Sequence, residues 1–145
     1  MKCWRTSLKN VDPIATKQYI DKANHFLQGM KYLHDDIGEF RTGIGLLAIH
    51  SAISLSDAIA VGLTGHQEKH TDHLQAARKL DELCGLNKIS DRRGIEHFRW
   101  LLGQKSSVAY QDRRFDDNSV RLAVEKAQRF SVWAYEYFRE VLRGV

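Results

Sequence analysis

The chain is poor in proline, with one in 145 residues. All-β proteins need many short turns, so this scarcity argues against an all-β fold. Only two cysteines are present, Cys3 and Cys84, and they lack the close spacing of metal ligands. Nothing in this usage suggests an oxidising compartment, and a chain of this length needs no disulfide or metal to bury a core.

Other signals are also missing. The first ten residues contain no long apolar core, so we expect no signal peptide and a cytoplasmic protein. Gly43 and Gly45 lack the preceding strand and the third glycine of a dinucleotide site, and no nucleophile elbow is present. The sequence therefore predicts no cofactor.

The chain carries 22 basic and 18 acidic residues, a formal net charge of +4. The excess lies in residues 91–145, which hold 11 basic and 8 acidic groups. This distribution permits a partner that bears phosphate, and a solvated basic face is the alternative explanation.

The longest apolar stretch, Gly43 to Leu63, is long enough to span a membrane. It contains His50 and Asp57, and a charge near the middle of a span costs at least ~3 kcal/mol. The stretch is also rich in alanine, serine and glycine, whose small side chains allow neighbouring helices to approach. We therefore predict the central helix of a bundle and no membrane contact.

Apolar residues recur at helical spacing through most of the chain, and no strand pattern is found. Helices are predicted over residues 13–35, 40–63, 72–84, 91–108 and 118–143. Asp12 and Pro13 are suited to a helix start, whereas Gly65 and Gly85 are suited to helix ends. The pattern predicts an all-α fold, an antiparallel four-helix bundle with one additional short helix. Residues 13–145 would form this single domain after an N-terminal extension, residues 1–12.

Several short segments in this order resemble the HEPN domains of prokaryotes. They are residues 48–52 with Asp57 on the second helix, Lys105 to Tyr110 at the end of the fourth, and residues 127–130 on the last. HEPN domains are helical bundles of toxin–antitoxin and abortive-infection systems, and the resemblance covers about residues 13 to 140. It implies a HEPN-like bundle that forms a homodimer and acts on RNA, or that associates with a nucleotidyltransferase-type partner protein.

In active members of this family, an arginine and a histidine four to six positions further on bind and cleave RNA. Lys105 and Tyr110 stand at the matching place. Lysine keeps the positive charge but lacks the bidentate fork of arginine, and a phenol is a poor proton shuttle at neutral pH. The resemblance thus implies a catalytically degenerate module that binds RNA, nucleotide phosphate or a partner protein through Lys105, Ser106, Tyr110, Arg113 and Arg114.

The alternative is a metal-independent ribonuclease that uses either Lys105 and Tyr110 or a second pair, Arg92 and His97. The second pair has the family's residue types at a permitted spacing, but it lies at the start of the fourth helix instead of its end. Residues five apart on a helix do not share a face well.

Asp57 is the least expected polar residue of the central helix. It could orient the site at Lys105 and Tyr110, or it could hydrogen-bond a neighbouring helix. His50 precedes it by seven residues and lies on the same face, so the two could form a polar seam that faces a second subunit.

His66, His70 and His73 are spaced by four and three residues, which would align them on a continuous helix as metal ligands. Part of this segment is predicted to be a loop, so surface histidines are the favoured interpretation.

Three aromatic residues near the C-terminus, Trp133, Tyr135 and Tyr137, could stack on bases. At helical spacing they are more often packed against a neighbouring helix.

Overall fold

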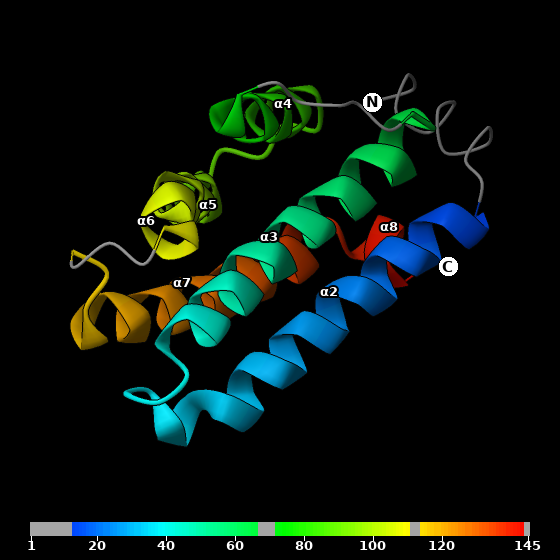
Figure 1. Cartoon of the computed structure of the whole chain (residues 1–145). Helices are drawn as coiled ribbons and strands as arrows, with labels where there is room; N and C mark the ends of the chain where they lie inside the picture. Colours follow the sequence, from blue (N-terminus) through cyan, green and yellow to red (C-terminus); the bar gives the residue numbers. More distant parts are fainter. Residues whose placement is uncertain (1–12, 67–71, 111–113, 144–145) are drawn as a thin grey trace.

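The computed structural model describes residues 13–66, 72–110 and 114–143, and within these ranges it is all-helical, with no strand (Figure 1). The all-α prediction is therefore confirmed. The predicted N-terminal extension and the cap at Asp12 lie outside the described residues. The elements are α2 (Pro13–Leu33), the 3₁₀ turn η1 (His34–Asp36), α3 (Arg41–Thr64), α4 (His73–Leu86), α5 (Arg93–Gly103), α6 (Lys105–Ala109), α7 (Asp117–Tyr137) and α8 (Arg139–Arg143).

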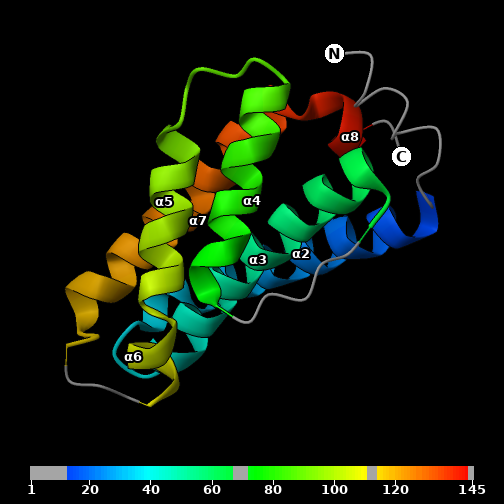
Figure 2. The same ribbon diagram turned by 90° about the horizontal axis from the view of Figure 1, so that it is seen from above.

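Helix α3 is the centre of the fold, since it packs against α2, α4, α5, α6, α7 and α8. In Figure 1 it lies between α2 and α7, while Figure 2 shows α4 and α5 as a second pair that crosses over it. Helix α3 is long and apolar enough to cross a membrane, but 67% of its most apolar window is buried by the other helices. The prediction of a central helix is confirmed.

Small residues on α3 allow its neighbours to approach the backbone. A Cβ added to Gly62 would lie 2.1 Å from Cγ1 of Val141 on α8, and one added to Gly45 would lie 2.7 Å from the ring of Phe115. The buried hydroxyl of Ser51 donates to the carbonyl of Ala48 over 2.8 Å, which satisfies the polar group within the helix. The small side chains thus explain how one helix can contact so many others.

Helices α2 and α3 form an antiparallel pair. The rings of Phe26 and His50 lie 5.9 Å apart between centroids, and a Cβ on Gly29 would lie 3.4 Å from Cδ1 of Leu47. From the first contact to the second, the position moves three residues forward on α2 and three residues back on α3, as expected for antiparallel helices. This register places Phe26 of α2 beside the polar residue His50 of α3.

One predicted helix end is confirmed and another is wrong. Gly65 ends α3 with a left-handed φ of 76°, and its N–H donates to the carbonyl of Val61 over 2.8 Å. Gly85 does not end α4, which continues to Leu86. Lys88 adopts the left-handed conformation instead, with a φ of 57°.

The two helices predicted last each divide in two. The segment predicted as 91–108 breaks at Gln104, directly after Gly103, whose lack of a side chain lowers helix propensity. The segment predicted as 118–143 breaks at Phe138, which is buried with its ring 5.8 Å from that of Trp133. This change of direction lets α8 reach Gly62 on α3.

The N-terminus of α7 is capped by Asp116, whose carboxylate accepts a hydrogen bond from the backbone N–H of Ser119 over 2.9 Å. The periodicity predicts a start at residue 118, one residue after the first residue of α7. Asp116 lies outside the apolar period, so periodicity alone does not find it.

Helix α5 meets α7 at a glycine. A Cβ on Gly94 would lie 2.0 Å from Cδ2 of Trp133, so the indole of Trp133 lies directly against the backbone of α5. The indole also continues a row of buried rings, with centroids 5.8 Å apart between Trp133 and Phe130 and 5.0 Å apart between Phe130 and Phe98. Only glycine fits at residue 94 without moving this row.

We expect the substitution Gly94→Ala to destabilise the fold by ~3 kcal/mol, the upper end of overpacking costs, because the new methyl group would displace Trp133. Gly103→Ala on the same helix is the matched control, since a Cβ there has no atom within 4 Å. It should stabilise the protein by ~0.5–1 kcal/mol through helix propensity. Urea unfolding followed by circular dichroism measures both; equal stability of the two variants would contradict the packing described here.

Candidate functional site

The residues predicted at the Lys105 site lie on and after the short helix α6. Lys105 is half-buried, Ser106 is exposed, and Tyr110 is 85% exposed directly after the helix. Arg114 is also exposed, and its backbone carbonyl accepts a hydrogen bond from the hydroxyl of Ser119 over 3.1 Å. Arg113 lies outside the described residues.

Lys105 belongs to a group of basic residues that three helices bring together. We call this group, Lys22 of α2, His50 of α3 and Lys105 of α6, the His50 cluster. Burial lowers the pKa of His50, and the charges of Lys105 and Lys22 lower it further. No carboxylate within the described ranges lies at ion-pair distance from Lys22 or Lys105. Among the residues that the structure describes, the two ammonium groups are thus not compensated by an ion pair.

An aromatic side chain supports this cluster. Phe26 packs its ring against that of His50, and the Nζ atom of Lys22 lies 5.9 Å from the centroid of the same ring. The imidazole and one ammonium group are thus held on the same aromatic residue of α2.

His50 and Asp57 both face α2: the ring of His50 lies against Phe26, and the charge of Asp57 acts on Tyr19. Asp57 is two turns beyond His50, about 10 Å along the helix axis. Burial raises the pKa of Tyr19 on α2, and the charge of Asp57 raises it further. The residue that Asp57 influences is therefore on α2.

Arg92, the N-cap of α5, and His97 within α5 face different helices. The Nε atom of Arg92 donates to Asp81 of α4 over 2.9 Å. His97 faces α7, where Lys126 and Arg129 act on its pKa. The structure does not bring the two side chains together as a pair.

The side chain of Arg92 also lies beside the buried thiol of Cys84. Burial raises the pKa of Cys84 to about 11, although the positive charge of Arg92 opposes the increase. A thiol in this environment is protonated at neutral pH and is a poor nucleophile.

The proposed histidine ligands are only partly described. His66 is exposed, directly after the C-cap of α3, whereas His70 and the side chain of His73 lie outside the described residues. Within residues 13–66, 72–110 and 114–143, no group of three His, Cys, Asp or Glu residues is placed to hold a metal ion.

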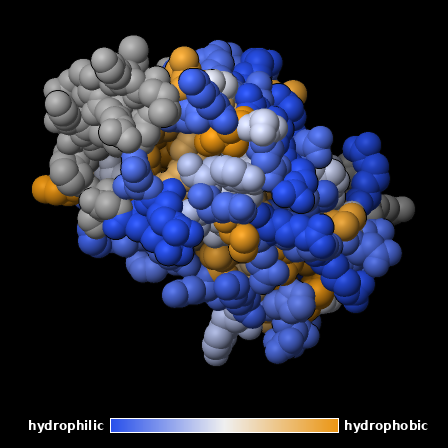
Figure 3. Space-filling view, turned by 180° about the vertical axis from the view of Figure 1, so that it is seen from behind, coloured by the Kyte–Doolittle hydropathy of each residue, from blue (hydrophilic) through white to orange (hydrophobic). Residues whose placement is uncertain are grey.

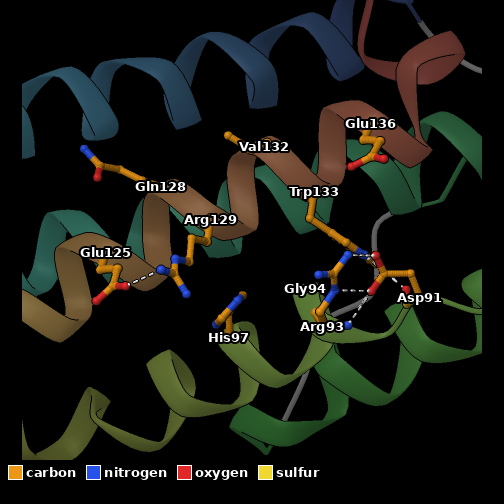
Figure 4. A pocket seen from close by; sticks show the side chains of 10 residues that line it. All are labelled: Asp91, Arg93, Gly94, His97, Glu125, Gln128, Arg129, Val132, Trp133 and Glu136. Carbon is orange, nitrogen blue, oxygen red and sulfur yellow. Dashed lines mark hydrogen bonds and ion pairs between the residues drawn. The ribbon is translucent and has the colours of Figure 1, made fainter.

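A second candidate site lies between α5 and α7, at a cavity of about 430 Å³ (Figure 4). This volume is within the range of small-molecule sites. We call it the α5–α7 pocket; it is lined by Asp91, Arg93, Gly94, His97, Glu125, Gln128, Arg129, Val132, Trp133 and Glu136.

One end of the pocket is built around Asp91. Its carboxylate accepts hydrogen bonds from the backbone N–H and the guanidinium of Arg93 and from the hydroxyl of Tyr137, over 2.7 to 3.0 Å. Its backbone carbonyl accepts a hydrogen bond from Nε1 of Trp133 over 3.1 Å. These bonds, led by that of the Arg93 guanidinium, hold the pKa of Asp91 well below its usual range.

The other end contains His97 and Arg129, which point toward each other from α5 and α7 in Figure 4. The Nδ1 atom of His97 is buried, and no described group lies within hydrogen-bond distance of it. Arg129 forms an ion pair of 2.7 Å with Glu125, one turn earlier on α7. Burial lowers the pKa of His97, and Lys126 and Arg129 lower it further.

The three aromatic residues near the C-terminus lie in or beside the α5–α7 crossing or pack within the fold. Trp133 is buried and Tyr137 is half-buried, both hydrogen-bonded to Asp91, and the guanidinium of Arg143 lies 5.5 Å from the ring centroid of the half-buried Tyr135. They pack within the fold, as helical spacing favoured.

Sequence reasoning missed most of this pocket. A usable signal was present in the spacing: Arg93 and His97 are four residues apart on α5, and Glu125 and Arg129 are four apart on α7. Lys22 was also missed, because its role depends on how α2 is placed beside α3.

Comparison of the chain with protein families, with curated proteins and with solved structures gives no match.

The lowered pKa values of His50 and His97 predict a pH dependence of stability. In both residues the folded state favours the neutral imidazole, so the unfolded state binds more protons once the pH falls below about 6.5. The stabilisation is complete above that pH and is lost as the pH falls from there through the lower pKa of the folded state. Chemical unfolding at pH 7.5 and 5.5 should show a lower free energy of unfolding at the lower pH.

The same pKa values test the positions of the neighbouring charges. We expect Lys105→Gln to raise the pKa of His50 and leave that of His97 unchanged, and Lys126→Gln to have the opposite selectivity. Proton NMR titration of the imidazole resonances measures both. An unchanged pKa of His50 in Lys105→Gln would remove Lys105 from the His50 cluster.

Proposed function

We propose that this chain is a HEPN-like helical module that binds the phosphate groups of RNA or of a nucleotide and does not cleave RNA. Its binding site is the His50 cluster together with Ser106, Tyr110 and Arg114. A role in a toxin–antitoxin or defence system, as a homodimer or with a nucleotidyltransferase-type partner, is part of the same proposal.

The observation that carries the proposal is that Lys22 and Lys105, on separate helices, both add to the lowering of the His50 pKa that burial causes, and that Lys22 also lies against the Phe26 ring that contacts His50. Neither ammonium group has a carboxylate partner within the described ranges, so a phosphate group would supply the missing negative charge. The exposed phenol of Tyr110 and the exposed side chain of Arg114 follow in the chain, and they are of the residue types that contact nucleic-acid backbones.

The proposed absence of cleavage follows from the chemistry of the side chains at this site. Cleavage requires a base for the ribose 2′-hydroxyl and an acid for the leaving oxygen. His50 is the one imidazole of the cluster and packs its ring against Phe26, and an amine and a phenol, Lys105 and Tyr110, stand where the resemblance has an arginine and a histidine. Arg92 and His97, the other pair considered for a ribonuclease, face different helices.

RNA binding is tested by fluorescence anisotropy with a short labelled single-stranded RNA. We expect affinity to fall steeply with added salt. Lys105→Ala should weaken binding ~5-fold and reduce the slope of log affinity against log salt by ~0.7, the value for one lost contact to a single strand. Arg114→Ala should weaken binding in the same direction.

Arg139→Ala is the control, because Arg139 is exposed on α8, at the other end of the molecule from α6 in Figure 1. It should leave the affinity nearly unchanged. If Lys105→Ala and Arg114→Ala bind RNA as tightly as the unmodified protein, this site is wrong. Incubation with total RNA tests the second half of the proposal; cleavage that is lost in Tyr110→Phe or His97→Ala would establish a ribonuclease instead.

A further inference from the structure

The α5–α7 pocket offers nitrogen donors from two helices around one space. Figure 4 shows His97 and Arg129 pointing into that space, with the guanidinium of Arg93 on its other side near Asp91. The two arginines are oriented by carboxylate partners. Asp91 accepts hydrogen bonds from Nε and one terminal nitrogen of Arg93, and Glu125 forms an ion pair with one terminal nitrogen of Arg129. Each guanidinium retains unused N–H groups for a ligand.

Two of the three acidic residues in the lining are therefore already neutralised. Glu136 is the third; within the described ranges it has no ion pair, and it lies beside Trp133, away from His97 in Figure 4. At His97 the positive charges of Lys126 and Arg129 affect the pKa more than the negative charges of Glu96 and Glu125. Arg129 and Lys126 are therefore the cations closest in effect to His97.

From this geometry we propose that the α5–α7 pocket binds the phosphate group of a small phosphate monoester between Arg93, His97 and Arg129. A carboxylate presents two oxygens in one plane, whereas a tetrahedral phosphate presents oxygens in several directions and suits donors that approach from different sides. His97 lines this space, and its buried Nδ1 atom has no hydrogen-bond partner among the described residues.

The size of the cavity extends the proposal beyond inorganic phosphate. About 430 Å³ leaves room for an organic group beside the phosphate, along the wall formed by Val132 and Trp133. Glu136 at that end can accept hydrogen bonds from hydroxyl or amino groups. A nucleoside monophosphate has these features, and the pocket is a separate site from the His50 cluster.

The test is proton NMR of the His97 imidazole during titration with three probes: inorganic phosphate, adenosine monophosphate and acetate. We expect a saturable shift of the His97 Cε1 proton with both phosphates, and ~10-fold tighter binding of the nucleotide because its organic group buries apolar surface. Acetate at the same concentration should give no saturable shift. The proposal is overturned if the His97 Cε1 proton shows no saturable shift with either phosphate, or if it shifts equally with acetate.

Variants locate the site. Arg129→Gln should weaken adenosine monophosphate binding ~10-fold, since one charge-assisted contact is lost. Glu125→Gln keeps an oxygen that can accept the Arg129 hydrogen bond but removes the competing negative charge, so it should bind at least as tightly as the unmodified protein; weaker binding would contradict a site for anions. Arg99→Gln is the matched control, because Arg99 is an exposed arginine of α5 outside the pocket.

Lys105→Ala separates this pocket from the His50 cluster. It should leave the response of His97 to phosphate unchanged even where it weakens RNA binding. If Lys105→Ala abolishes the His97 response, the phosphate is bound at the His50 cluster and the pocket proposal fails. Should RNA binding prove absent while His97 responds as expected, the proposed function fails and the pocket stands.

Discussion

The contact between Trp133 and the backbone of Gly94 is the constraint on which the rest of the structure depends. It sets the distance between α5 and α7, and Asp91 fixes it from one side through hydrogen bonds to Trp133, Tyr137 and Arg93. A single missing methyl group thus permits the indole to fill the space where two helices cross. Because hydrogen-bonded groups surround the indole, the crossing is defined in orientation as well as in distance.

The two candidate sites follow from how helices are placed around α3. The His50 cluster forms where α2 and α6 bring lysines close enough to one histidine of α3 to lower its pKa beyond the effect of burial. The α5–α7 pocket forms next to the Gly94 crossing, where His97 and Arg129 face each other from the two helices. Figure 3 shows that the molecule presents mostly hydrophilic residues on the face turned away from the view of Figure 1, with apolar residues scattered among them. Polar recognition suits such a surface better than broad apolar contact.

The sequence was sufficient for the helical class and for the central helix, because the periodicity of apolar residues and the small residues of α3 are local signals. It was also sufficient for the left-handed end at Gly65. It did not locate the breaks at Gln104 and Phe138, since the second depends on the burial of one ring against Trp133, a contact made by tertiary packing. The left-handed residue at Lys88 was missed because lysine carries no preference for that conformation.

The candidate sites were predictable only in part. Lys105 was found through a resemblance in spacing, but Lys22 joins it from a helix more than 80 residues earlier in the chain. The spacing of Arg92 and His97 suggested a catalytic pair. In the structure, Arg92 faces α4 and His97 faces α7. The role of Asp91 in holding Trp133 and Tyr137 depends on α7, which follows more than 25 residues later in the chain.

The most direct test of this account is hydrogen exchange at the indole N–H of Trp133, followed by nitrogen-15 NMR. The account predicts slow exchange, close to that of the most protected backbone amides, because this N–H donates to the carbonyl of Asp91 in a buried crossing. Replacement of Gly94 by alanine should accelerate it. Exchange as fast as that of an exposed indole in the unmodified protein would show that α5 and α7 are not held together in this way, and the description of both the crossing and its pocket would be wrong.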